Sequence, residues 1–234
     1  MPRVPLLAGS RVSVVGVPDD VTLVRPPPPL DPLTDVAGAV GEALRFPLSG
    51  PPLEQLVTRG ARVTIAVDPP VLPLPGAVDD PRREALAGTI AALERAGVPT
   101  ERQTILVAGG LERRAGSREL EALLRPARAR RFHGRVVVHD CEHPDLRPLG
   151  EAGPLPVRVS PALVEADLVV VVSAAETVVH GGPAVLLGAC GADTARAGAE
   201  ADSLLVAGAA PGWALAEAVE RMLTARVPAV GVSL

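Results

Sequence analysis

Apolar and polar positions divide this chain into two kinds of segment that alternate from about residue 60 onward. Short runs of β-branched and aliphatic residues predict strands, and longer runs with a period near 3.6 predict helices. Most of the short runs are continuously apolar, as strands covered on both faces require. The predicted strands are Arg62–Val67, Gln103–Val107, Arg135–His139, Leu168–Val172, Leu204–Ala207 and Ala229–Val232. This alternation predicts an α/β fold with a mostly parallel sheet and helices on both faces.

Capping residues locate the helices between these strands. Asp80-Pro81 is typical of a helix start, and the helix that follows should run to about Ala96, before Gly97. Ser160-Pro161 repeats the same pattern. The other predicted helices are Val36–Leu44, Ser117–Leu124 and Ala214–Thr224.

The first sixty residues follow a different pattern. Ser13–Val17 and Val21–Val24 predict a small antiparallel unit, and the proline run Pro26–Pro29 is unsuited to a central strand. We assign residues 1–200 to one α/β domain and interpret 201–234 as the start of a second domain or a terminal strand–helix–strand extension. Because the chain ends on a predicted strand, we expect a C-terminal domain or a second copy of the chain to complete it.

Composition excludes several classes of function. All 23 basic residues are arginine, so neither a Schiff-base lysine nor a P-loop lysine exists in this chain. Two Phe, one Trp, no Tyr and a net charge of -4 argue against nucleic acid as a partner. The N-terminus resembles neither a signal peptide nor a membrane span, and two cysteines are too few for a disulfide scaffold. We therefore expect a cytoplasmic protein with no membrane partner.

His139, Cys141 and His143 form the most metal-like pattern, because alternate residues of an extended segment point to one side. Three such ligands can hold zinc. However, the run lies where a strand should end, and Pro144 follows it directly. A solvated strand end is the favoured interpretation, and we assign no metal ligand.

Three loops that follow apolar strands carry groups suited to binding or catalysis. The candidate residues are Asp68 after the first strand, Gly110, Glu112 and Arg113 after the second, and Glu176, His180, Gly181 and Gly182 after a third. Ligands of parallel sheets bind outside the carboxyl ends of the strands, so these loops should line one concavity. Each loop also has a structural interpretation, since an aspartate before prolines ends a strand and a glycine pair forms ordinary turns.

Five segments of the chain occur in a familiar order. They are 43–53, Arg62–Asp68, Thr104–Arg113 with Glu119 beyond it, Val137–Asp140 with Leu149-Gly150, and Ala166–Val169 with Glu176 and Gly181–Pro183. Together they resemble the N-terminal domain of the LarA family, the nickel-dependent lactate racemases and related 2-hydroxyacid racemases and epimerases. The resemblance covers roughly residues 40–200 and implies the same α/β fold.

The resemblance also implies a nickel-pincer nucleotide tethered to a lysine, with histidines that shuttle the substrate's α-proton. This chain has Ala184 at the lysine position, so covalent attachment is not expected. The histidine of the family's G-x-H-R motif is replaced by Glu112, whereas its arginine is retained as Arg113. Asp68 is retained from a second motif, and His180 lies in a shortened loop near the position of a second histidine.

Two functions follow from these residues. The first is a divergent racemase or epimerase of small 2-hydroxy acids, with Glu112 as acid and base, Asp68, Glu176 and His180 beside it, and the cofactor held by Arg113 and the glycines at 110, 181 and 182. The second is a non-catalytic binding or scaffold domain of a larger chain or complex. A carboxylate is a poor base for an α-proton unless burial raises its pKa, which favours the second. A small carboxylate is the expected ligand in either case, bound by Arg113 and backbone amides of the helices after Gly110 and Gly182.

Overall fold

The computed structural model describes residues 2–8, 11–22, 31–69, 81–112, 114–116, 120–121, 123–124, 129–173, 184–199 and 211–234. Contacts divide the chain into two units, Met1–Leu33 and Thr34–Leu234, which are described separately below. In these described ranges, no helix combines the length and apolar character needed to cross a bilayer.

The first unit is an antiparallel hairpin of β1 (Arg3–Ala8) and β2 (Arg11–Gly16). The predicted antiparallel unit is therefore present, but the predicted pairing of Ser13–Val17 with Val21–Val24 is not found in the described part: Val21 and Thr22 belong to no strand, and residues 23 and 24 lie outside the described residues. The partner strand precedes β2 rather than following it. Only Gly9-Ser10 separates the two apolar runs in the sequence, and such a short glycine-containing link favours a hairpin.

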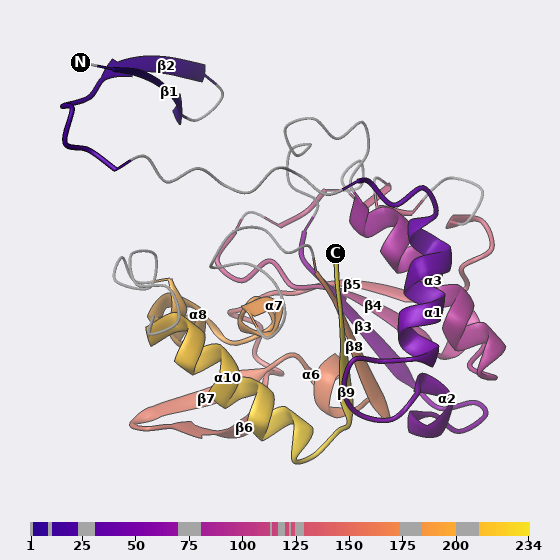
Figure 1. Ribbon diagram of the computed structural model, residues 1–234. Coiled ribbons are helices and arrows are strands. Elements are labelled where there is room, and N and C mark those ends of the chain that lie inside the picture. The colour runs from indigo at the N-terminus through magenta and orange to yellow at the C-terminus, as the bar shows by residue number, and fades with distance from the viewer. Residues whose placement is uncertain are drawn as a thin grey trace. The chain divides into compact units, whose positions relative to one another are not determined.

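The second unit is built on a five-stranded, entirely parallel sheet (Figure 1). Its strands, in spatial order, are β5 (Arg135–Val138), β4 (Gln103–Val107), β3 (Val63–Val67), β8 (Leu168–Ser173) and β9 (Ala229–Ser233). This arrangement confirms the predicted α/β class and five of the six predicted strands. The sixth, Leu204–Ala207, lies outside the described residues.

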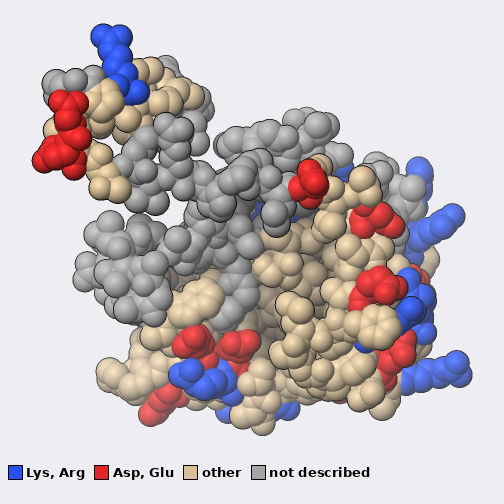
Figure 2. Space-filling model, viewed as in Figure 1, with Lys and Arg blue, Asp and Glu red and all other residues tan. Residues whose placement is uncertain are grey.

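One face of the sheet is covered by α1 (Val36–Arg45), α2 (Leu53–Leu56) and α3 (Pro81–Arg95). Alternate strand residues such as Ile65, Ile105 and Val170 enter this core and are fully buried. Basic and acidic side chains lie next to one another on the surface of the molecule (Figure 2). On α1, Glu42 and Arg45 form such a pair at 3.6 Å. Val40 and Leu44 form the buried stripe of α1. By contrast, α3 is buried on all sides from Ala85 to Ile90, because it contacts both α1 and β8.

The opposite face is covered by α6 (Pro161–Val164), α7 (Ala184–Leu187), α8 (Ala192–Gly198) and α10 (Pro211–Thr224). The other set of alternate strand residues, including Ala66, Leu106 and Val169, enters this second core. A hairpin of β6 (Arg147–Ala152) and β7 (Leu155–Val159) packs beside α10. Because each face of the sheet is covered by a core, its strands are apolar at nearly every position. A short 3-10 helix, η1 (Thr100–Arg102), leads into β4.

The sequence pattern did not predict the β6–β7 hairpin. β6 mixes exposed and buried positions without strict alternation, and its register with β7 shifts between Pro148 and Gly150. β7 does alternate, but it is only five residues long and contains Pro156. The turn between them is marked by Gly153, whose φ of +60° suits glycine. Of the predicted helix Ser117–Leu124, only residues 120, 121 and 123 are described as helical.

Candidate site at the carboxyl edge of the sheet

The parallel strands place the loops after β3, β4, β5 and β8 at one edge of the sheet. The ladder continues one residue beyond two of the strands, because the Ala108 N–H donates to Val67 O and the His139 N–H donates to Val107 O, both at 2.9 Å. Asp68 follows β3 directly at this edge. This is the edge at which ligands of parallel sheets bind.

Asp68 forms an ion pair with Arg82, with 3.9 Å between the carboxylate Oδ2 and the guanidinium Nη1. The Arg82 side chain is only 4% exposed, whereas that of Asp68 is 28% exposed. Arg82 lies in the first turn of α3, where the helix macrodipole disfavours a cation. The carboxylate of Asp68 offsets both this effect and the burial of the charge.

Arg82 was missed in the sequence analysis, although its position carried a signal. The first turn of a helix usually favours acidic residues, yet α3 begins with Pro81, Arg82 and Arg83 before Glu84. A basic pair at that position indicates a nearby carboxylate or anion. Asp68 is the carboxylate that the structure brings to it.

The glycine pair after β4 packs closely against the end of α7. The Gly110 N–H donates to Gly188 O at 2.8 Å, and the Glu112 N–H donates to Gly109 O at 2.8 Å. Gly110 has a φ of +52°, a conformation that favours glycine. These two amides are therefore bonded within the protein, whereas binding of an anionic ligand by the other amides of this loop stays a prediction. Residues 110–112 form a turn, and no helix begins among them.

His139 is buried, and its Nε2 lies 2.7 Å from the carbonyl oxygen of Cys190. A carbonyl only accepts, so Nε2 carries the hydrogen. Burial lowers the pKa of His139; its bond to Cys190 and the nearby Asp140 act in the opposite direction, whereas His143 adds to the lowering. The ring is therefore held neutral at neutral pH, as a structural link between β5 and the segment after α7.

The run from His139 to His143 does not stay extended, because β5 ends at Val138 and residues 141–142 form a turn. The expected solvated strand end is wrong for His139, which is buried, whereas His143 is exposed. Across the described ranges, no three His, Cys, Asp or Glu side chains are grouped closely enough to hold a metal ion.

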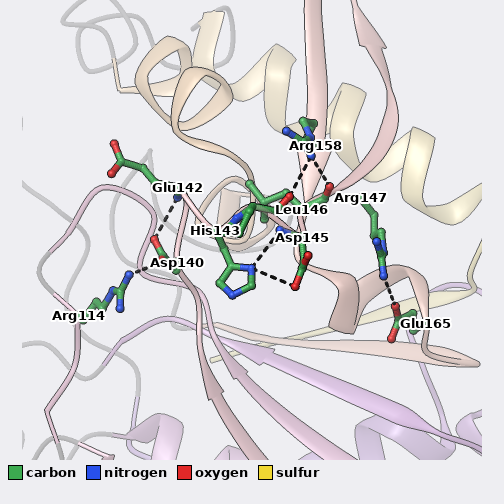
Figure 3. A network of polar contacts seen from close by, with 10 residues as sticks. Arg114, Asp140, Glu142, His143, Asp145, Leu146, Arg147, Arg158 and Glu165 are labelled. Carbon is green, nitrogen blue, oxygen red and sulfur yellow. Dashed lines mark hydrogen bonds and ion pairs between the residues drawn. The ribbon is translucent and has the colours of Figure 1, made fainter.

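Asp140 organises the loop after β5 (Figure 3). It forms an ion pair with Arg114, and its Oδ1 accepts the Glu142 N–H at 3.1 Å. The backbone bond from Glu142, and then the guanidinium of Arg114, lower the pKa of Asp140. Arg114 was not among the predicted residues, although it adjoins Arg113, which lies outside the described residues. The pair links the loop after β4 to the loop after β5.

Cys190 is a buried free thiol whose pKa is raised to about 12 by desolvation. Its Sγ donates to Leu186 O at 3.3 Å. A thiol this far from ionisation is a poor nucleophile. Cys190 therefore acts as a core residue rather than as a reactive group.

The structure places part of the predicted site. Asp68, Gly110 and Glu112 follow neighbouring strands at the same edge, and Glu112 is exposed in the turn after Gly110. Ala184 is the first residue of α7. The remaining predicted residues, Arg113, Glu176, His180, Gly181 and Gly182, lie outside the described residues. Convergence of Asp68, Glu112 and Glu176 on one concavity stays a prediction.

We expect the stability of this protein to fall as the pH drops below about 6.5. His139 has a lowered pKa in the folded state, so between its ordinary and folded values the unfolded chain binds more protons. The contribution of His139 to the free energy of unfolding is thus fully present above about pH 7. It is lost as the pH falls toward the pKa of His139 in the folded state, by at most about 1.4 kcal/mol per pH unit for one proton. Urea titrations between pH 7.5 and 5 measure this slope.

The matched variant is His139→Gln, whose amide can still donate to the carbonyl oxygen of Cys190. It should remove the slope between pH 6.5 and 5, because glutamine does not titrate. A wild-type protein with constant stability over this range would contradict the assignment of a neutral, buried His139.

A parallel sheet covered by helices on both faces, with candidate groups at its carboxyl edge, defines this chain as an α/β domain. Residues 9–195 match the model of one family, the lactate racemase N-terminal domain. The chain belongs to this family. No match is found among curated proteins.

Two solved structures show the same fold. The lactate racemase apoprotein from Thermoanaerobacterium thermosaccharolyticum superimposes with a TM-score of 0.71 and 17% identity, covering 100% of this chain and 56% of that chain. A protein from Thermotoga maritima gives a TM-score of 0.61 and 17% identity, covering 87% of this chain and 51% of that chain. This chain therefore spans about half the length of the structures that it matches.

Proposed function

We propose that this domain binds a small carboxylate, of the 2-hydroxy acid type, at the carboxyl edge of its sheet, without a covalently attached nickel cofactor. The observation that carries the proposal is the parallel order of β3, β4 and β5, which brings the loops after these strands, with Asp68 and Glu112, to the edge where ligands of such sheets bind. Arg113, next to Glu112 in the sequence, is the arginine proposed to recognise the carboxylate through two parallel N–H donors. The 2-hydroxy acid class is suggested by a structural relative that is a lactate racemase.

The residues of this chain do not fit the covalent cofactor that the family resemblance implies. A thioamide tether needs the amine of a lysine, and Ala184 at the start of α7 ends in a methyl group. All 23 basic residues of the chain are arginine, so no neighbouring amine can substitute. The proposed function therefore contains no step that depends on that tether.

Binding without racemisation is the better-supported role for this edge. Glu112, which replaces the family's histidine, is exposed in a turn, and a hydrated carboxylate is a weak base toward a carbon-bound proton. The Nε2–H of the buried His139 donates to the carbonyl oxygen of Cys190, so this histidine has a structural role and does not act as the base. We also propose that the domain acts in the cytoplasm, where its free Cys141 and Cys190 would stay reduced.

Calorimetry with D-lactate, L-lactate, glycolate and malate tests the proposal. We expect millimolar or tighter binding, weakened about tenfold by Arg113→Ala because a bidentate bond to a carboxylate is lost. Arg131→Ala is the matched control, since it removes an exposed arginine from a turn before β5. Binding unchanged by Arg113→Ala would discard the role of that arginine, and no binding at millimolar ligand would overturn the proposed function.

Intact-mass and nickel analysis of the purified protein tests the second part of the proposal. The expected result is the mass of the unmodified chain, with no increment that survives denaturation. Stoichiometric nickel with such an increment would contradict it. Interconversion of D- and L-lactate, abolished by Glu112→Gln, would instead establish the racemase alternative.

A further inference from the structure

A polar row crosses the face of the sheet away from the carboxyl edge. Thr64 of β3 pairs in register with Thr104 of β4, which pairs in turn with Arg135 of β5. Neighbouring strands lie about 4.8 Å apart, so the three side chains form one line on one face. The next row on the same face is Ala66, Leu106 and Val137, as apolar as a covered sheet requires.

This polar row lines a cavity of about 510 Å³, bounded also by η1, the start of α6 and the loop after β5. Small-molecule sites usually measure about 300–1,000 Å³. Part of the loop that bounds the cavity is seen in Figure 3, where His143 and Asp145 contact each other. The cavity therefore has the size and the mixed polar lining of a ligand site; it reaches the loop after β5, but its polar row lies toward the opposite end of the strands from Asp68 and Glu112.

Ser160 gives an independent indication of a ligand. It lines this cavity, is 4% exposed and stands at the N-cap of α6, but its hydroxyl makes no capping bond. Among the residues that the structure describes, this hydroxyl has no hydrogen-bond partner. The hydroxyl is therefore open to the cavity and available to pair with a group bound there. Thr64 donates to Ala162 O at 2.6 Å and can still accept.

Two guanidinium groups give the amino-terminal end of the cavity a positive charge. Arg102 and Arg135 line it and are exposed, and neither has a carboxylate within ion-pair distance in the described ranges, although Arg102 is near enough to Asp167 to help lower the pKa of that carboxyl. Two other charged residues of the lining form ion pairs: Arg62 pairs with Asp167 at 3.5 Å, and Glu165 pairs with Arg147 at 3.5 Å. Glu101 opposes the two arginines with one negative charge, so this end keeps a net positive charge.

We propose that this cavity binds a small hydroxylated phosphate, such as a sugar phosphate. Arg102 and Arg135 would hold the phosphate, because guanidinium groups match phosphate oxygens bidentately. The hydroxyls of Ser160, Thr64 and Thr104 would pair with the hydroxyl groups of the ligand. The proposal concerns a different part of the domain from the proposed carboxylate site and does not depend on it.

Calorimetry with glucose 6-phosphate, inorganic phosphate and glucose separates the two halves of the proposed ligand. We expect glucose 6-phosphate to bind at least about tenfold more tightly than either fragment, because each extra charged or hydroxyl contact adds free energy. Equal affinity for inorganic phosphate would overturn the assigned role of the hydroxyls. Absence of binding at millimolar glucose 6-phosphate would overturn the site itself.

Two variants test the residues. Arg135→Ala should weaken binding about tenfold, and Ser160→Ala several-fold, the latter with an unchanged melting temperature because its hydroxyl bonds nothing in the protein. Arg131→Ala, with the same change in net charge, should leave binding unchanged. If Arg131→Ala weakened binding as much as Arg135→Ala does, the loss of affinity would come from the overall charge of the protein, and the proposal would be overturned. Arg113→Ala should not affect this ligand, so failure here and failure of the carboxylate site are distinguishable.

Discussion

Replacing Gly188 with alanine should lower the free energy of unfolding by about 3 kcal/mol, at the upper end of ordinary overpacking costs. A Cβ at this position would lie 2.1 Å from Ala108 O and 2.8 Å from its carbonyl carbon. Ala108 has little freedom to move away, because its N–H donates to Val67 O at 2.9 Å. The bond from the Gly110 N–H to Gly188 O, at 2.8 Å, would be lost in any displacement.

Urea denaturation followed by circular dichroism measures this loss. Gly231→Ala is the matched control, since a Cβ there meets nothing within 4 Å in the described structure and the residue lies in β9. Its effect should stay within about 0.5 kcal/mol, as for a strand glycine without close neighbours. Similar losses in the two variants would show that the contact between Gly188 and Ala108 is not what constrains this position.

Removing the charge of Asp68, by Asp68→Asn, should cost about 2 kcal/mol of stability. The guanidinium of Arg82, 4% exposed, would then lose its ion pair. Breaking a fully buried ion pair costs about 3–5 kcal/mol, and the smaller value follows because Asp68 is 28% exposed and water can partly replace it.

A double-mutant cycle isolates the ion pair from other contacts of these residues. Asp68→Asn combined with Arg82→Met should be less destabilising than the sum of the single variants, because no uncompensated charge is left buried. Glu42→Ala, which breaks the exposed pair with Arg45 at 3.6 Å, is the control and should cost less than about 1 kcal/mol. Strict additivity of Asp68 and Arg82 would contradict their direct coupling.

The parallel sheet could be predicted because its strands are buried on both faces. Gln103–Val107 was predicted with its observed bounds, and Leu168–Val172 and Ala229–Val232 each fall one residue short of the observed strand. A continuous apolar run leaves few alternatives to a central strand. The β6–β7 hairpin was missed for the opposite reason, since its half-exposed strands lack that pattern.

The sequence predicted where the candidate site lies better than it predicted which side chains and amides are paired there. Strand order placed Asp68 and Gly110 at one edge, as expected from the carboxyl ends of parallel strands. The partner of Asp68 comes from α3; the basic first turn of that helix indicates a nearby carboxylate, but nothing in the sequence shows that this carboxylate is Asp68. The amides of the glycine loop were expected to be open to a ligand, whereas Gly188 accepts one of them.

By itself, the sequence determined the fold class, the strands of the central sheet and the absence of a lysine for a covalent cofactor. These properties are local or compositional, so they need no knowledge of which distant segments meet. Only the tertiary structure decided that Arg82 is buried beside Asp68, that His139 is held by Cys190 O, and that Ser160 faces a cavity. Such contacts depend on how helices pack against the sheet, and packing is selected by the shapes of whole surfaces rather than by any single segment.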